Sequence, residues 1–92
     1  MATWRGNTAV SATSTAYSET ATIGVYSLTN KTAGNITVNL GIINGATVLI
    51  APKDMTIAAG NSYYGEGGVS LPGGATINVT TTGSLDYYFS IK

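Results

Sequence analysis

Residues 36–45 read Ile-Thr-Val-Asn-Leu-Gly-Ile-Ile-Asn-Gly, and this stretch decides the fold. Apolar side chains at 36, 38, 40 and 42 alternate with small or polar ones at 37, 39 and 41, a period of two that predicts a β-strand with one buried face. The pair Asn44-Gly45 follows directly. It favours a two-residue type I′ hairpin, because both central positions need positive φ. We therefore expect a partner strand over residues 46–51.

Strand patterns of similar length continue on both sides of this hairpin. We expect further strands over residues 21–29, 55–58, 62–65, 69–71, 75–82 and 85–92. The apolar phase shifts near Val25, which indicates a β-bulge or a two-sided environment. Residues 20–92 therefore predict one all-β domain, an antiparallel β-sandwich of about seven short strands with either jelly-roll or immunoglobulin-like connections.

Residues 1–19 show no sustained strand or helix period and are rich in Ala, Ser and Thr. We expect them to form an extended N-terminal arm outside the sandwich. The pair Trp4-Arg5 stands out, because an apolar ring in a polar segment costs free energy unless something covers it. Three placements are open: docking on a neighbouring subunit, folding back as an edge strand that tucks Trp4 under its own sandwich, or disorder.

Charged residues make up 9% of the chain, and there is no His and no Cys. Ordinary globular domains contain about a quarter charged residues. The exposed positions are therefore filled by short hydroxyl and amide side chains, which lose little rotamer entropy when a partner covers them. This composition predicts a surface that another protein can cover.

The same composition argues against several functional classes. Without His or Cys, and with four acids scattered singly, we expect no enzyme, no catalytic residues, no cofactor and no metal site. A net charge of zero provides no basic stripe for nucleic acid. No apolar run is long enough for a membrane span or a signal peptide. We expect synthesis in a cytoplasm and no membrane partner.

Exposed aromatic side chains are the strongest candidates for a binding surface. If residues 62–65 are extended, Tyr63 and Tyr64 point to opposite faces, so one of them lies outside the core. Tyr and Trp are enriched at the centres of protein interfaces, and their rings can also stack on sugars. The bland alternative is packing at sheet ends or beneath loops. The candidate interface residues are Trp4, Arg5, Tyr17, Tyr63, Tyr64 and Tyr88.

The order of short motifs is similar to that of a known class. These are residues 23–30 (IGVYSLTN), 36–40 (ITVNL), 50–52 (IAP), 57–61 (IAAGN) and 71–77 (LPGGATI). The series resembles small β-sandwich virion structural proteins of tailed bacteriophages, which are found as capsid decoration (cement) proteins and in tail-associated structures. The likeness covers residues 20–92 and rests on turns and strand patterning.

This resemblance implies a function of binding rather than catalysis. It implies a capsid decoration protein that binds and stabilises the outer shell of the virion, with the major capsid protein as its partner. The resemblance also implies a homo-oligomer, and among the possible oligomers it favours a trimer. The alternative is a tail- or surface-associated module that binds a receptor or a glycan.

Overall fold

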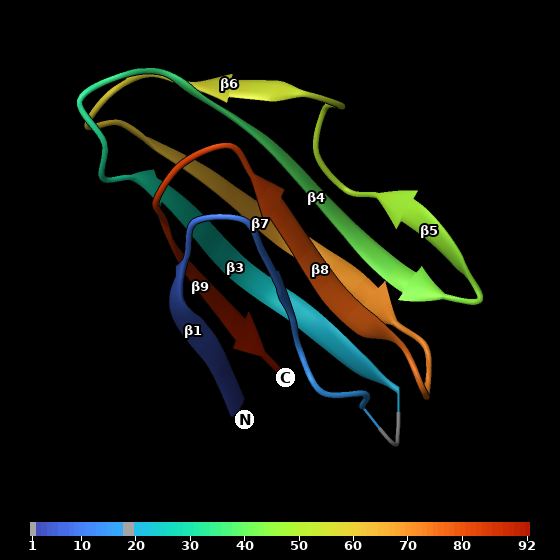
Figure 1. Cartoon of the computed structure of the whole chain (residues 1–92). Coiled ribbons are helices and arrows are strands. Elements are labelled where there is room, and N and C mark those ends of the chain that lie inside the picture. The colour runs from blue at the N-terminus through green and yellow to red at the C-terminus, as the bar shows by residue number, and fades with distance from the viewer. Residues whose placement is uncertain (1, 18–19) are drawn as a thin grey trace.

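The computed structural model describes residues 2–17 and 20–92, without the side chains of Ala2 and Glu66. Over this part of the chain all regular structure is β, and Figure 1 shows the strands stacked in two layers. The strands are β1 (Ala2–Thr8), β2 (Ser11–Thr13), β3 (Ala21–Asn30), β4 (Ile36–Asn44), β5 (Ala46–Leu49), β6 (Met55–Ile57), β7 (Ser62–Leu71), β8 (Thr76–Thr81) and β9 (Leu85–Ile91).

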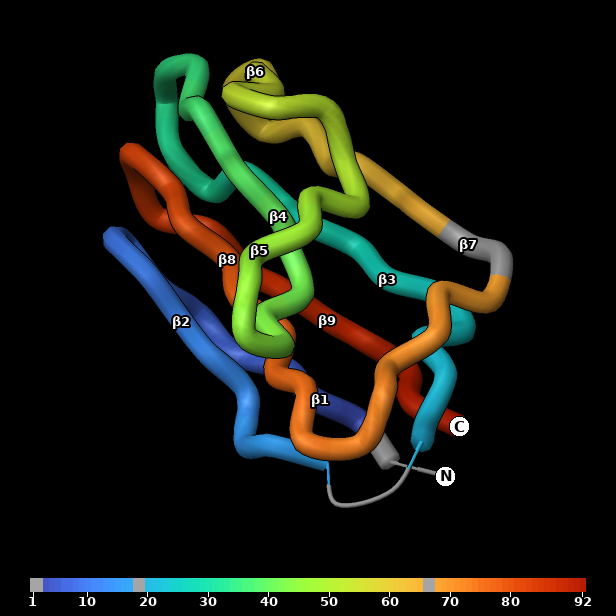
Figure 2. The backbone as a smooth tube through the Cα atoms, turned by 90° about the vertical axis from the view of Figure 1, so that its right-hand side faces the viewer, coloured from blue at the N-terminus to red at the C-terminus, as the bar shows by residue number. Residues whose placement is uncertain are grey.

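The described strands form two antiparallel sheets. One has the order β1-β9-β3-β7 and the other the order β2-β8-β4-β5, with β6 also paired to β4 beside β5. The chain changes sheet at nearly every connection, as the tube in Figure 2 lets the reader follow. This order is that of an eight-stranded jelly roll in which one edge strand is split into β5 and β6. The fold is thus the predicted all-β sandwich, and the topology decides for the jelly-roll alternative.

The core lies between the two sheets and follows the predicted alternation. In β4 the side chains of Val38 and Leu40 are fully buried, and β8 contributes Ile77 and Val79. Phe89 is the largest fully buried side chain of the facing sheet. The complete set of buried apolar residues is Ile23, Tyr26, Leu28, Ile36, Val38, Leu40, Ile42, Ile57, Leu71, Ala75, Ile77, Val79, Leu85, Phe89 and Ile91.

The predicted hairpin at Asn44-Gly45 forms, but its turn differs from the expectation. Gly45 has a φ of 78°, whereas Asp54 is the one described non-glycine residue with a positive φ. Asn44 lies opposite Ala46 across Gly45. Because a type I′ turn needs positive φ at both central positions, the predicted type I′ turn is wrong. The partner strand also ends at Leu49 rather than at residue 51.

The predicted irregularity near Val25 is confirmed as a β-bulge. The register of β3 shifts between Ile23 and Val25 against β7, and the same part of β3 is irregular against β9. β7, which pairs with β3 at this bulge, is one continuous strand. The sequence had instead predicted two strands, over residues 62–65 and 69–71. Gly68, with a φ of 69°, accommodates the shift, because glycine tolerates this backbone conformation.

The predicted arm is wrong for residues 2–13, which belong to the sandwich. β1 pairs with β9 over its whole length, and β2 pairs with β8. This is the fold-back placement, in which Trp4 is half-buried at the edge of the core. The sequence of β1 shows no alternation of apolar and polar residues, because Gly6 occupies the inward position after Trp4 and has no apolar side chain. Met1 and residues 18–19 of the predicted arm lie outside the described residues.

One polar side chain is completely buried where β3 leaves its sheet. The Nδ2 group of Asn30 donates hydrogen bonds to the carbonyl oxygens of Gly34 and Ile57, both at 2.8 Å. Its Oδ1 atom accepts hydrogen bonds from the backbone N–H and the hydroxyl of Thr32, also at 2.8 Å. Asn30 thereby fixes the loop between β3 and β4 to β6 without leaving a buried polar group unpaired.

Candidate functional site

Cross-strand register gathers outward side chains of the four-stranded sheet into one row. Tyr88 lies opposite Arg5 on one side and opposite Ser27 on the other, and Ser27 lies opposite Tyr64. Directly paired residues of neighbouring strands point to the same face of a sheet. Arg5, Tyr88, Ser27 and Tyr64 therefore line up across β1, β9, β3 and β7. We call these four residues the tyrosine row.

A hollow of about 510 Å³ lies along this row. The side chain of Tyr64 is 75% exposed and that of Tyr88 is 40% exposed. Only the small side chain of Ser27 stands between them. Because neighbouring strands lie about 4.8 Å apart, the backbones that carry the two rings are roughly 10 Å apart. The residues that line the hollow are Val25, Tyr26, Ser27, Tyr64, Gly65 and Tyr88.

The bulge in β3 adds an apolar side chain to the same face. Val25 follows the register shift, lines the hollow and is 49% exposed. A regular strand would place residues 23 and 25 on the same face, yet Ile23 is fully buried. The bulge thus turns Val25 outward beside Ser27. Val25 and both tyrosines are thus exposed large side chains that line the same hollow.

Tyr26 and Gly65 support the hollow from below. The two residues lie opposite each other, and a Cβ atom placed on Gly65 would overlap the ring of Tyr26. The Tyr26 ring stacks on Phe89 at a centroid distance of 5.4 Å, and its hydroxyl donates a 3.5 Å hydrogen bond to the Ile50 carbonyl oxygen. Burial, and then the neighbouring Tyr63, raise the pKa of Tyr26 above its ordinary value of 10.0. This phenol is therefore neutral at physiological pH and supports the packing.

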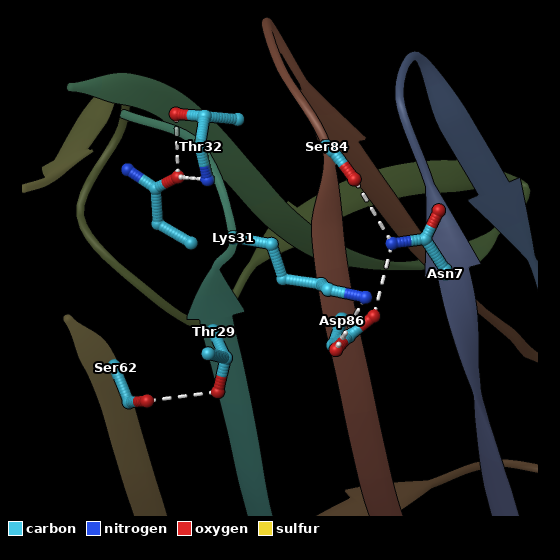
Figure 3. Close-up of polar contacts among 8 residues, drawn as sticks. Asn7, Thr29, Lys31, Thr32, Ser62, Ser84 and Asp86 are labelled. Atoms are coloured by element: carbon cyan, nitrogen blue, oxygen red, sulfur yellow. Dashed lines mark hydrogen bonds and ion pairs between the residues drawn. The ribbon is translucent and has the colours of Figure 1, made fainter. Parts of the chain in front are cut away.

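A polar row runs beside the tyrosine row on the same face, and Figure 3 shows its contacts. Asn7 Nδ2 donates to Asp86 Oδ1 at 2.9 Å, and the hydroxyls of Thr29 and Ser62 share a 2.8 Å hydrogen bond. Lys31 Nζ lies 3.6 Å from Asp86 Oδ2. Both charged groups are about half exposed, so this ion pair contributes little to stability. Its effect is that the Lys31 ammonium group neutralises the negative charge of Asp86 on the face that carries the hollow.

The structure brings three of the six predicted interface residues together. Arg5, Tyr64 and Tyr88 share the tyrosine row, although they come from three strands far apart in the sequence. As predicted, Tyr63 and Tyr64 point to opposite faces, because Tyr63 packs against the core and Tyr64 does not.

The other three predicted residues pack against the core. The Trp4 ring lies 4.4 Å from Tyr87 and 5.2 Å from Phe89, measured between ring centroids. Tyr17 is half-buried, and its backbone N–H donates a 3.1 Å hydrogen bond to the Ala75 carbonyl oxygen. The Tyr63 ring lies 6.2 Å from Tyr26. These rings stabilise the sandwich edge and contribute little to the tyrosine row.

The sequence analysis missed Val25 and Ser27 as members of the face. The phase shift at Val25 was a visible signal that this side chain leaves the core. No local signal identified Ser27, because its importance comes from its two cross-strand neighbours. The position of Ser27 between the two tyrosines can be recognised only when the register of the three strands β7, β3 and β9 is known.

The face carries residue types that are common in protein interfaces. Tyr and Arg are the residue types that most often dominate the free energy of protein association. Within residues 2–17 and 20–92, no three or more His, Cys, Asp or Glu side chains group to hold a metal ion. Nor does that part of the chain form a helix long and apolar enough to cross a membrane.

Comparison with known proteins gives a likeness of fold. No family model matches the sequence, and a search of the curated proteins found no match. Among solved structures, a chain in the structure of infectious bursal disease virus, Gx strain, is similar, with a TM-score of 0.56 over 97% of this chain at 11% sequence identity. The match covers 30% of that viral chain, so the present chain spans less than a third of its length. A β-sandwich like the one described here thus also occurs in a chain of a virus structure.

Proposed function

We propose that this chain is a structural protein of a virus particle and that its activity is binding to another protein of that particle. The observation that carries the proposal is the tyrosine row, where the exposed Tyr64 and Tyr88 line a hollow and Arg5 lies opposite Tyr88 on the neighbouring strand. The similarity of the fold to a chain of a virus structure supports the same class of function.

The finer proposal is a capsid decoration protein of a tailed bacteriophage, with the major capsid protein as its partner. The described residues form one sandwich with an exposed outer face on its four-stranded sheet. It is well suited to bridge neighbouring shell subunits, because each bridge adds contact area that must be lost before the shell opens. The outer face of the β1-β9-β3-β7 sheet supplies that contact, with the half-exposed Tyr88 near its centre.

The proposal predicts that binding to particles depends on the two tyrosines. The test mixes the purified chain with virus particles produced by the cells that encode it. Sedimentation of the particles then measures how much of the chain is bound. We expect Tyr64→Ser combined with Tyr88→Ser to weaken binding at least about tenfold, because truncation of a hot-spot residue at the centre of an interface costs about 2 kcal/mol or more. The matched control is Val10→Ser, since Val10 is 74% exposed but lies outside the row.

Two outcomes would overturn this proposal. One is equal binding of the double variant and the Val10→Ser control. The other is absence of wild-type binding to the particles at any concentration tested, with a folded chain verified by circular dichroism. Both outcomes can be interpreted as effects on binding, because both tyrosines point away from the core. Their replacement therefore leaves the packing of the sandwich in place.

A glycan-binding module is the second candidate, and one observation favours it. Two exposed rings, carried by backbones roughly 10 Å apart with the small Ser27 between them, form a site on which a sugar ring can stack. A screen of cell-surface glycans separates the two functions. Saturable glycan binding that is lost in Tyr88→Ala, without binding to particles, would favour the module over the structural protein.

A further inference from the structure

β5 is an open edge of the five-stranded sheet. Within the described residues it pairs with β4 alone, and each of its four residues is exposed. Figure 1 shows β5 at the periphery of the molecule, with no strand beyond it. The backbone groups on its outer side are therefore free to pair with a further strand.

Val48 of β5 faces the core but is left uncovered. It lies opposite Ile42, which in turn lies opposite Ile77, and both isoleucines are buried. Cross-strand partners share a face, so Val48 belongs to the inner face of the sheet. It is nevertheless 63% exposed. Val48 thus points to the inner face of the sheet, but it remains largely exposed to solvent.

The neighbouring side chains confirm this orientation. A Cβ atom placed on Gly41 would lie 3.1 Å from Thr47 Cγ2 and 3.5 Å from Leu49 Cδ2. Thr47 and Leu49 thus cover Gly41 on one face of the sheet, and Val48 between them points to the opposite face. Leu49 is 40% exposed, so the edge offers an apolar side chain on each face.

The β5 edge differs from both edges of the four-stranded sheet in having neither a charge nor a register shift. Charges and bulges normally keep edge strands from pairing with other chains. β1 has Arg5, and β7 has the register shift at the bulge. In contrast, residues 32–52, which include all of β5, contain no charged residue. Two copies of the chain can therefore approach along β5 without charge repulsion.

We propose that β5 pairs antiparallel with β5 of a second copy of this chain, around a twofold axis. The two five-stranded sheets then join into one continuous sheet, and the two Val48 side chains cover each other on its inner face. A second copy fits better than an unrelated peptide, because an antiparallel pair of identical strands satisfies the same edge in both copies at once. The neutral edge also offers nothing for a charged partner.

The inference does not depend on the proposed function, because β5 and the tyrosine row belong to different sheets. A twofold pair also differs from the trimer expected from the resemblance, since pairing of identical edges closes at two copies. Stable interfaces usually bury more than about 1,000 Å², and β5 is short, so we expect a reversible dimer that populates at roughly 100 μM.

Sedimentation equilibrium of the full chain over a concentration series tests the dimer. The wild type should shift from monomer to dimer with increasing concentration, and Val48→Lys should remain monomeric at every concentration. The matched control is Val10→Lys, because Val10 is an equally apolar, 74% exposed residue outside β5. It should dimerise as the wild type does. A monomeric wild type at about 500 μM, a trimer, or an unchanged dimer of Val48→Lys would overturn the inference.

Amide hydrogen exchange of the wild type provides a readout without any substitution. Exchange in residues 46–49 should slow as the protein concentration rises, while exchange in β1, on an edge of the other sheet, stays constant. Exchange in β5 that is independent of concentration would contradict the pairing. The Tyr64→Ser, Tyr88→Ser double variant should still dimerise, which separates failure of this inference from failure of the proposed function.

Discussion

Gly65 is the residue whose replacement most directly damages the packing beneath the tyrosine row. Any Cβ atom there would enter the ring of Tyr26, which is held between Gly65 and Phe89. We expect Gly65→Ala to lower the free energy of unfolding by at least about 2 kcal/mol, because the buried ring has little room to move. Urea denaturation measures this change.

The matched control for that substitution is Gly34→Ala. Gly34 lies in the loop between β3 and β4, and a Cβ atom there meets nothing within 4 Å. Its replacement should change the free energy of unfolding by no more than about 0.5 kcal/mol. Equal effects of the two substitutions would show that the contact between Tyr26 and Gly65 has no special role.

Tyr26 predicts a specific loss of stability at alkaline pH. Its pKa is raised in the folded state above the ordinary 10.0, so the folded protein holds the phenol proton more tightly than the unfolded chain does. This contribution is complete below about pH 10 and is lost as the pH rises through the raised pKa. Urea midpoints between pH 8 and pH 11.5 should therefore fall more for the wild type than for Tyr26→Phe.

Exposed Tyr64 supplies the control for the pH experiment. Tyr64 is 75% exposed, and its ring lies on the outer face. Tyr64→Phe should leave the alkaline decrease of the wild type unchanged. If Tyr26→Phe loses stability over the same pH range and by the same amount as the wild type, Tyr26 is not the group that titrates.

Among the elements, β1 is the strand whose docking can be followed most simply. Its Trp4 is the single tryptophan of the chain, and its ring packs against Tyr87 and Phe89. Tryptophan fluorescence should therefore change at the same urea concentration as circular dichroism. We expect Trp4→Ala to cost about 2 kcal/mol of unfolding free energy, since the side chain is half-buried.

Thr3→Ala is the control within the same strand. Thr3 is exposed, and its replacement should cost less than about 0.5 kcal/mol. A fluorescence transition at much lower urea than the circular dichroism transition would mean that β1 detaches as a separate arm. That result would restore the arm predicted from the sequence.

Local patterns predicted the elements well where the pattern itself carries the information. The alternation in residues 36–42 gave β4 and its buried face, and the phase shift at Val25 gave the bulge. The edge strand β1 was missed, because pairing with β9 depends on residues at the opposite end of the chain. For the same reason the sequence placed Tyr88 and one of Tyr63 and Tyr64 outside the core, but the alignment of Tyr64 and Tyr88 across Ser27 required the register of three strands.

At the scale of the whole molecule, the jelly roll offers two separate surfaces. The tyrosine row lies on the outer face of the β1-β9-β3-β7 sheet, whereas the open β5 edge belongs to the second sheet. A chain of this size buries a smaller share of its surface than larger domains do. Covering either surface would add contact area that the isolated sandwich lacks, and the low charge of the chain reduces the cost of covering it.

Imaging of intact virus particles by electron cryo-microscopy, from cells that encode this chain, tests the central claim most directly. The account predicts density for the sandwich on the particle, with Tyr64 and Tyr88 turned toward a neighbouring protein. Particles that lack the chain would contradict the account. A bound sandwich whose two tyrosines face solvent would contradict the assignment of the tyrosine row as the binding face.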